Sequence, residues 1–472
     1  DTARNTLEQT RSALADAFPD YGAFADPKPL DLVSATRFLR PDEALVMFAT
    51  SDMEGIATAE PSVVMALTAE GYVWSPLPAR AELADLALAL RCAAALTDRH
   101  CGAGSGKTRG AFSLVEDTGE ESDGSAFDYE IAHRAYAELL EPVSAAFEGK
   151  TALIIVPDKA LAAMPFHLML TGPAAPDTSP RDAPWLIRKM SVSVAPSVSS
   201  LSALRDKTVI ASAAPLPFLG VGDPLIGSQR MAPVPVDCGR YAEPALLTAA
   251  LELPDEPLLR NGLTAREGAI AALPALPETR CELAATADSF GPESQLLLQD
   301  HATETAIKSL SASGALERFR VLSFATHGLV AGELGANQAG LVLTPPDAAT
   351  ADDDGLLTIE EIAGLRINAD FVLLSACNTA AGSRPVDDSL SGLASAFFLA
   401  GARSLLVSHW PVYSDAAVRL TTGMFGALSA DPAISRPEAL RRSMLAILDD
   451  PAADAAMLHP AFWGPFIIAG GG

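Results

Sequence analysis

Short apolar runs alternate with amphipathic stretches along the first half of this chain. Runs of branched and aromatic residues bounded by turn-forming residues predict strands, and apolar residues spaced three or four apart predict helices. The predicted strands are 44–49, 62–67, 71–74, 153–156 and 190–194. The predicted helices are 80–96, 129–147 and 199–204. This alternation is typical of an α/β layer architecture.

The same pattern begins again after Thr208. The predicted strands of this second half are 218–221, 295–298, 320–329, 341–343, 371–375 and 404–409. The predicted helices are 280–290, 303–311, 358–363 and 390–400, with two more within 414–448. Strands that alternate with helices predict a mainly parallel sheet with helices on both faces.

Four segments interrupt these patterns. Residues 2–18 have the apolar spacing of an amphipathic helix, which ends at Pro19. Residues 100–126 and 331–355 are rich in small and acidic residues and are expected to be mobile loops that gate a site. Residues 232–277 are rich in proline and predict an irregular insertion.

Charge and hydropathy exclude several classes of protein. The formal net charge of −26 argues against binding nucleic acid or an anionic membrane surface. No apolar run approaches the roughly 20 residues that cross a bilayer, and no secretory signal is visible, so we expect a soluble, cytoplasmic protein. The chain opens at Asp1 without a methionine, which leaves open whether it is excised from a longer parent.

The five cysteines occupy positions 92, 101, 238, 281 and 377. Their number is odd, they form no CxxC pair, and their spacing matches neither a disulfide framework nor a zinc site. We therefore expect reduced thiols, as in intracellular proteins.

Two strand ends carry residues suited to nucleophilic catalysis. The run FVLLSACNTA, 371–380, reaches Cys377, and RVLSFATHGL, 320–329, reaches His327. Ligands bind outside the carboxyl ends of parallel strands, so His327 and Cys377 meet there if their strands are neighbours. An imidazole can then activate the thiol, and the N–H groups of Gly328 and Cys377 can bind an oxyanion. The alternative is a hydrogen-bonded core histidine and an inert buried thiol.

An ordered series of motifs resembles the CHAT domains, a family of caspase-like proteins often found beside tetratricopeptide repeats. In the second half these are RVLSFATHG, DGLLTIEEI, FVLLSACNTAAG, SGLASAFFLAGARSLLVSHWPV and the closing HPAFWGPFIIAG. Earlier matches are KTALIIVPDKALAAMPFHLML, WLIRKMSVSVAPSVSSL and VGDPLI. The resemblance covers the chain from about Pro19 to its end.

The resemblance implies a caspase-like α/β fold and a cysteine peptidase whose His–Cys dyad falls on His327 and Cys377. It also implies that an inactive, pseudo-caspase-like half, 19–205, packs against an active half, 206–472. The N-terminal helix, 1–18, would then be the stump of a repeat array, although no repeat with a 34-residue period survives.

The substrate pocket is less defined. Basic-specific relatives such as metacaspases place an aspartate two residues before the nucleophile, where this chain has Ser375. That difference weakens a prediction of cleavage after Lys or Arg. Asp223 is the alternative pocket acid, or else an ordinary turn aspartate before Pro224. The acidic run 352–354 either lines the cleft or forms an exposed loop.

Three other patterns do not support a site. CGAGSGKT, 101–108, lacks the first glycine of a phosphate-binding loop and follows a helix rather than a strand. His409 ends a strand and could join His327 and Cys377 as a metal site, but no second-shell signature accompanies it, so we expect structural packing and no metal. Ser375 and Ser408 lack the setting of a serine nucleophile. No cofactor is predicted.

We therefore predict a cysteine endopeptidase that cleaves a protein substrate, is gated by loops or by a partner, and acts in bacterial signalling, defence or programmed cell death. The expected partners are a protein or peptide substrate and a repeat-containing or regulatory protein. The alternative is a catalytically silent regulatory module that binds a protein through the same cleft.

Overall fold

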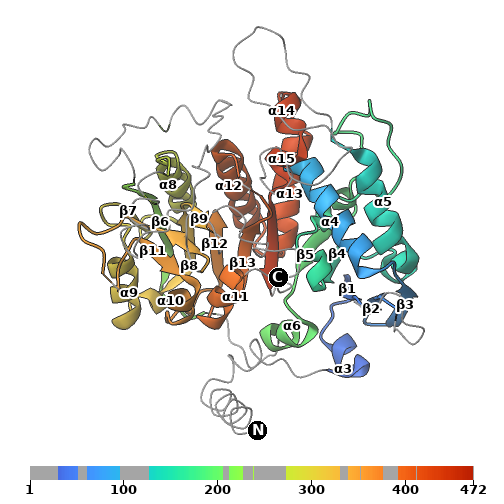
Figure 1. Cartoon of the computed structure of the whole chain (residues 1–472), viewed down its shortest axis with the longest axis horizontal. Coiled ribbons are helices and arrows are strands. Elements are labelled where there is room, and N and C mark those ends of the chain that lie inside the picture. Colours follow the sequence, from blue (N-terminus) through green and yellow to red (C-terminus); the bar gives the residue numbers. More distant parts are fainter. Residues whose placement is uncertain are drawn as a thin grey trace.

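The fold is built on one large, mostly parallel sheet flanked by helices (Figure 1). The computed structural model describes residues 30–51, 61–95, 127–205, 212–226, 238, 270, 273–329, 338–350, 352–375, 392–410 and 412–470. Eleven strands from both halves of the described chain form this sheet, and three short strands form a second sheet. The predicted fold class, a mainly parallel sheet with flanking helices, is confirmed.

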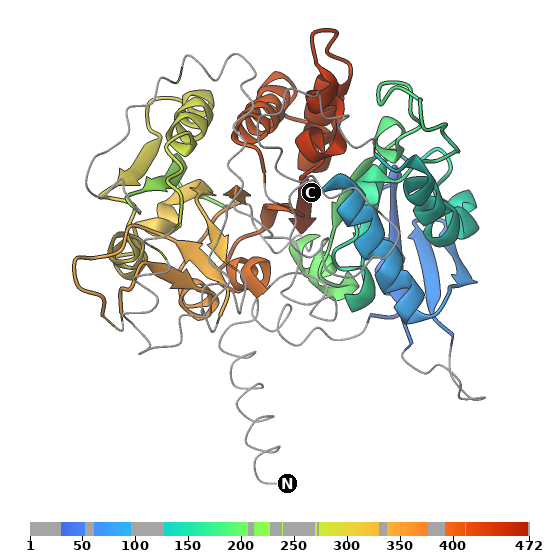
Figure 2. The same ribbon diagram turned by 45° about the horizontal axis from the view of Figure 1, so that its top comes forward.

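The strands of the large sheet, in spatial order, are β3 (Gly71–Pro76), β2 (Val63–Thr68), β1 (Glu43–Ala49), β4 (Ala152–Val156), β5 (Ser191–Val194), β14 (Phe466–Gly470), β13 (Ser404–Ser408), β12 (Phe371–Ser375), β8 (Phe319–Ala325), β6 (Leu216–Pro224) and β7 (Gln295–Gln299). The main helices are α4 (Arg80–Ala94), α5 (Tyr129–Leu139), α6 (Val198–Arg205), α8 (Thr279–Phe290), α9 (Glu304–Ala312), α10 (Ile359–Ala363), α11 (Gly392–Leu399), α12 (Ser414–Ala430) and α13 (Arg436–Leu448). Figures 1 and 2 both show α12 and α13 side by side above the middle of the sheet.

The two halves of the large sheet run in opposite directions. Strands β1, β4 and β5 are parallel to one another and to β14. Strand β14 is antiparallel to β13, which is parallel to β12, β8, β6 and β7. The carboxyl ends of the parallel strands in the first half therefore lie at the opposite edge of the sheet from those in the second half.

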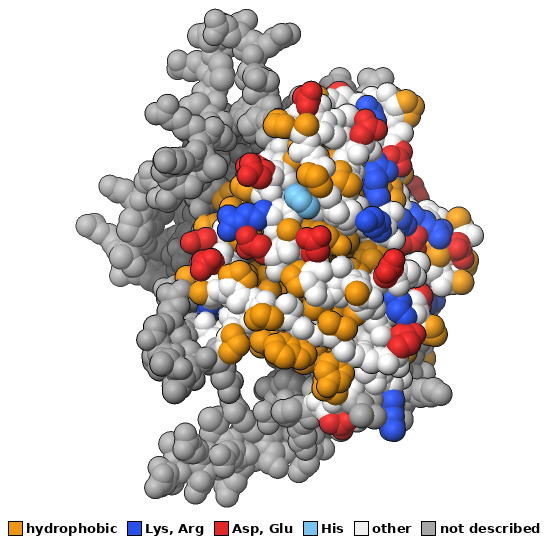
Figure 3. All heavy atoms as spheres, turned by 90° about the vertical axis from the view of Figure 1, so that its right-hand side faces the viewer, with side chains coloured by type: hydrophobic (Ala, Val, Ile, Leu, Met, Phe, Trp, Pro, Cys, Tyr) orange, Lys and Arg blue, Asp and Glu red, His pale blue; other side chains and the backbone are white. Residues whose placement is uncertain are grey.

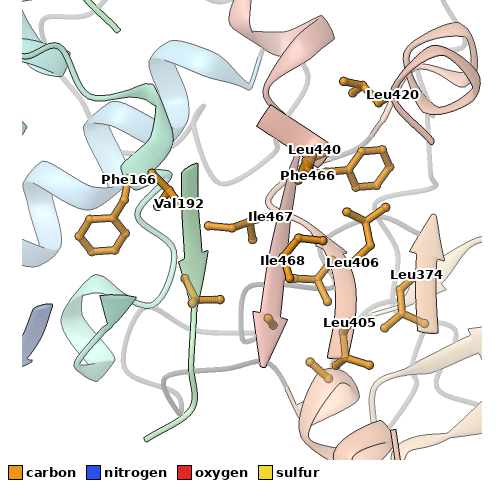
Figure 4. Close-up of a cluster of buried hydrophobic side chains, with 14 of the residues drawn as sticks. Phe166, Val192, Leu374, Leu405, Leu406, Leu420, Leu440, Phe466, Ile467 and Ile468 are labelled. Atoms are coloured by element: carbon orange, nitrogen blue, oxygen red, sulfur yellow. The ribbon is translucent and has the colours of Figure 1, made fainter. Parts of the chain in front are cut away.

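The last strand, β14, joins the halves through a continuous apolar core. Its Phe466, Ile467 and Ile468 are fully buried. Figure 4 shows them between Val192 of β5 on one side and Leu406 of β13 on the other. Residues on a strand buried on both faces are apolar at successive positions, which explains why the runs in this sequence do not alternate.

The second sheet is small and antiparallel, and it continues directly from β8. It consists of β9 (Gly328–Leu329), β10 (Gly340–Val342) and β11 (Leu356–Thr358). A separate apolar cluster supports it and includes Leu329, Val342 and Leu356 from the three strands. The predicted single strand 320–329 is thus wrong, because the chain leaves the large sheet after Ala325 and enters the small one at Gly328.

Two other predictions also differ from the structure. The predicted helix 129–147 ends at Leu139 and continues as the 3-10 helix η2 (Glu141–Phe147), because Pro142 lacks the N–H that an α-helix needs. Most of the acidic run 352–354 is buried, so it does not form the exposed loop that was one of the two alternatives. Glu304 of α9 accepts the backbone N–H groups of Asp354 and Gly355 at 2.8 and 2.6 Å.

The outer edge of the sheet exposes apolar side chains. Strand β3 pairs only with β2 among the described strands, and Tyr72 and Trp74 are 53% and 57% exposed. Figure 3 views the molecule from this side and shows hydrophobic side chains gathered among charged ones. The expected N-terminal helix 1–18 and the expected loop 100–126 lie outside the described residues.

Candidate active site

His327 lies where the chain crosses from the large sheet to the small one. Its backbone is held on the small-sheet side, because its carbonyl accepts the N–H of Val342 at 2.9 Å. The hydroxyl of the preceding Thr326 donates to the carbonyl of Val342 at 2.5 Å. Both bonds hold the backbone around His327 at the carboxyl end of β8.

The hydrogen bond of the imidazole identifies its tautomer. His327 Nε2 lies 2.8 Å from the carbonyl oxygen of Pro274, which can only accept, so Nε2 carries the proton. The side chain is 5% exposed, and burial lowers the pKa of His327 although the bond to Pro274 opposes that shift. At neutral pH the ring is therefore neutral, and its free lone pair is on Nδ1. A ring in this state can accept a proton at Nδ1 while Pro274 holds the opposite nitrogen.

Gly328 follows in a backbone geometry that leaves its N–H directed away from the small sheet. Gly328 pairs with Leu341 across β9 and β10. Since the ladder bond runs instead from Val342 to His327, Gly328 and Leu341 form a non-hydrogen-bonded pair. The N–H of Gly328 thus points away from β10, as an oxyanion donor requires.

Strand β12 ends beside β8 in matching register. Ser375, its last residue, is paired with Ala325, the last residue of β8. The neighbouring strands that the sequence analysis required for a His–Cys pair are therefore present. Cys377 itself lies outside the described residues, two positions beyond Ser375 in the sequence.

Asp223 lies at the carboxyl end of β6, on the other side of β8 from β12. It sits at an irregularity of the pairing with β7 and has a φ of 49°, a left-handed conformation that aspartate tolerates. The side chain is fully buried, and its Oδ2 accepts from Arg280 Nε at 2.9 Å. Burial raises the pKa of Asp223, and Arg280 counteracts that rise.

Glu282 is a carboxyl group at this edge that the sequence analysis did not identify. It is 3% exposed on α8, and its Oε2 accepts from the hydroxyl of Ser375 at 3.1 Å. Burial raises the pKa of Glu282 to about 8, and the nearby charge of Glu278 adds to the rise. A single glutamate in a predicted helix is usually exposed to solvent. No feature of the sequence therefore indicated that Glu282 is buried at the site.

A disulfide links Cys238 to Cys281 of α8, with 5.3 Å between their Cα atoms. Cys92 is disulfide-bonded as well. The expectation of reduced thiols is therefore wrong for these cysteines. Cys238 and Cys281 are 43 residues apart, and only the fold brings them together, so their spacing in sequence gave no indication of the bond.

The disulfide can be tested by the reactivity of its two cysteines. When the protein is unfolded in iodoacetamide without a reductant, Cys238 and Cys281 should stay unmodified, because disulfide sulfurs are not nucleophilic. After reduction with dithiothreitol, both should be alkylated, as peptide mapping by mass spectrometry would show. Cys377 serves as the internal control and should react in both samples. Alkylation of Cys281 without reductant would mean that the bond is absent.

Other residues considered for a site have structural contacts here. His409 is buried, and its ring stacks on that of His167 at 5.6 Å between centroids. Among the described residues, no group of three or more His, Cys, Asp or Glu side chains is arranged to hold a metal ion. The segment 101–108 lies outside the described residues. No helix in the described part of the chain is both long and apolar enough to cross a membrane.

The sheet is mostly parallel, His327 follows two residues after the end of β8, and in the sequence Cys377 follows two residues after the end of the neighbouring β12. These features agree with the expected caspase-like fold. A comparison with family profiles agrees and matches residues 129–471 to the CHAT domain. The chain belongs to the CHAT domain family. The match begins later than the resemblance from about Pro19 suggested, and β1, β2, β3 and α4 precede it within the same sheet.

Solved structures give more distant likenesses. Separase of Saccharomyces cerevisiae, in its complex with securin, is similar at 10% identity and a TM-score of 0.45, over 95% of this chain and 31% of the separase chain. The Arg-specific cysteine proteinase gingipain R is similar at 10% identity and a TM-score of 0.37, over 73% of this chain and 66% of its own. This chain thus spans about a third of the separase chain. No curated protein matches it.

Proposed function

We propose that this protein is a cysteine endopeptidase with Cys377 as nucleophile and His327 as general base and acid. The Sγ of Cys377 attacks a peptide carbonyl carbon after His327 Nδ1 takes the thiol proton. The C–N bond then breaks, the amine leaves with the proton from His327, and a thioester remains. Water, deprotonated by the same imidazole, hydrolyses the thioester and restores the thiol.

The observation that carries this proposal is the position and tautomer of His327. Its Nε2–H is held by the carbonyl of Pro274, and β12 ends beside β8 with Ser375 opposite Ala325. The outward N–H of Gly328, together with that of Cys377, is proposed to bind the oxyanion, a contribution of about 3–4 kcal/mol where it has been measured. A hydrogen-bonded core histidine could make the same bond to Pro274, so the catalytic role is supported by the neighbouring end of β12 and the outward N–H of Gly328.

We assign Ser375 and Asp223 to the proposed substrate pocket, because they end the two strands on either side of β8. The charge of Asp223 is already balanced by Arg280, and Ser375 carries no charge. These two residues therefore favour a P1 side chain other than Lys or Arg. The biological setting we propose, bacterial signalling, defence or cell death with a regulatory protein partner, rests on the family resemblance alone.

The test uses a set of peptide acyloxymethyl ketones that differ at P1. At least one should alkylate Cys377, and mapping by mass spectrometry should find the label on that residue alone. The same wild-type protein and Cys377→Ala should then be incubated with cell lysate, and new protein N-termini identified. Termini that appear only with the wild type would be its cleavage products.

Two results would contradict the proposal. Undiminished cleavage by Cys377→Ala would exclude Cys377 as nucleophile. Absence of labelling by every peptide ketone, with and without lysate as a source of activators, would favour the non-catalytic binding module instead. Circular dichroism of Cys377→Ala should match the wild type, so that loss of activity does not reflect loss of fold.

A further inference from the structure

Glu282 occupies an environment that a carboxyl group rarely takes without a specific partner. It is 3% exposed, and the described polar contact of its carboxyl is the hydroxyl of Ser375. Burying a carboxyl group destabilises its charged form, and burial is the main cause of the raised pKa of about 8. The group is therefore mostly protonated at neutral pH, and its role in the fold is that of a neutral hydrogen-bonding side chain.

Its partner, Ser375, is the last residue of β12 at the candidate site. Ser375 is paired with Ala325, and two residues beyond Ala325 the chain reaches His327. Two residues beyond Ser375 it reaches Cys377. A contact that holds Ser375 in place therefore holds the end of β12, from which the chain continues to Cys377.

Helix α8 is anchored well enough to serve as a reference for Ser375. The hydroxyl of its first residue, Thr279, accepts the backbone N–H of Asp223 at 2.9 Å, and Arg280 binds the Asp223 carboxylate. Cys281 is linked to Cys238. Four consecutive residues of α8, ending with Glu282, thus contact the ends of β6 and β12 and the residue Cys238.

We propose that Glu282 is a positioning residue of the active site: from the first turn of α8 it holds Ser375, and through Ser375 the end of β12 in line with His327. The inference rests on the proposed function, because it assigns Glu282 to the reaction of Cys377. It goes beyond that function by giving α8 a part in the site. A neutral acceptor at position 282 suffices for this role.

The test is a double-mutant cycle with peptide acyloxymethyl ketone labelling of Cys377 as readout. Glu282→Ala and Ser375→Ala should each lower the maximal labelling rate about 10- to 100-fold, the range that misplacement of reacting groups by an ångström produces. In Glu282→Ala, the ketone concentration at half-maximal rate should change by less than about twofold, because positioning affects the step after binding. Ser375→Ala also alters the proposed substrate pocket, so only its maximal rate is compared. The double variant should lose no more than either single variant, since both remove one contact.

Conservative and control variants separate positioning from general destabilisation. Glu282→Gln keeps a neutral acceptor and should stay within about twofold of the wild-type labelling rate. Glu293→Ala removes an exposed carboxylate just beyond the other end of α8 and should change nothing. Melting temperatures of all variants, measured beside the labelling, would show any loss of fold.

The outcomes are distinct. Additive losses in the double variant, or a wild-type labelling rate in Glu282→Ala, would overturn the role of Glu282 while leaving the peptidase intact. Failure of wild-type Cys377 to react with any ketone would instead refute the proposed function. Equal losses in Glu282→Ala and Glu282→Gln would also overturn the proposal, because they would show that a neutral hydrogen-bond acceptor at position 282 does not suffice to hold Ser375.

Discussion

Replacing His327 by alanine is expected to lower the rate at which peptide ketones label Cys377, and the rate of proteolysis, by about 10²- to 10⁴-fold. Burial lowers the pKa of His327, so the ring is neutral at pH 7 and able to accept the thiol proton at Nδ1. Without that base, the thiol retains its proton at neutral pH, because an unperturbed cysteine has a pKa near 8.5. The residual reaction should therefore rise steeply with pH between about 7 and 9.

Two variants control this experiment. His327→Gln keeps an N–H donor for the carbonyl of Pro274 but supplies no base, so it should be as inactive as His327→Ala while melting closer to the wild type. His301 is exposed on the surface, and His301→Ala should have wild-type activity. An active His327→Gln would show that the imidazole holds the structure and takes no part in proton transfer.

Replacing Glu282 by glutamine is expected to stabilise the protein more at pH 7 than at pH 5. The pKa of Glu282 is raised from 4.5 to about 8, so folding takes up a proton between those values, and the wild type loses stability as the pH rises through that window. At 1.36 kcal/mol per pH unit, the loss is about 3 kcal/mol at pH 7 and about 1 kcal/mol at pH 5. Glutamine does not titrate and avoids both losses.

Urea unfolding of the two proteins at both pH values would measure this difference. The advantage of Glu282→Gln should grow by about 2–3 kcal/mol from pH 5 to pH 7. Glu293→Gln changes an exposed carboxylate by the same chemistry and should show no such growth. An advantage that is constant with pH would mean that Glu282 is not buried as a protonated acid.

Patterns along single segments predicted most of the fold. Apolar runs located β4, β12 and β13 within one or two residues. That β8 and β12 are neighbours was only a condition for the His–Cys pair, and the fold supplies it. The error at 320–329 has a physical cause. Residues buried in a large sheet and in a small one look alike, so the change of sheet at His327 left no mark in hydrophobicity.

The contacts around the candidate site were harder to predict because they join segments far apart in sequence. Pro274 holds His327 from 53 residues away, and Glu282 reaches Ser375 across 93. Burial of Glu282 depends on how α8 packs, which a helical pattern does not determine. The Cys238–Cys281 bond was missed for the same reason.

Because β13 and β14 are antiparallel, ligands at the carboxyl ends of the parallel strands approach the two halves of the sheet from opposite edges. A ligand at the carboxyl ends of β1, β4 and β5 approaches from the side opposite His327. A protein bound there and a substrate at the candidate active site would therefore not compete for space. Any influence of one on the other would be carried by the contacts that join the halves, among them the strands β5, β14 and β13 and the bond from Arg441 of α13 to the carbonyl of Ile187.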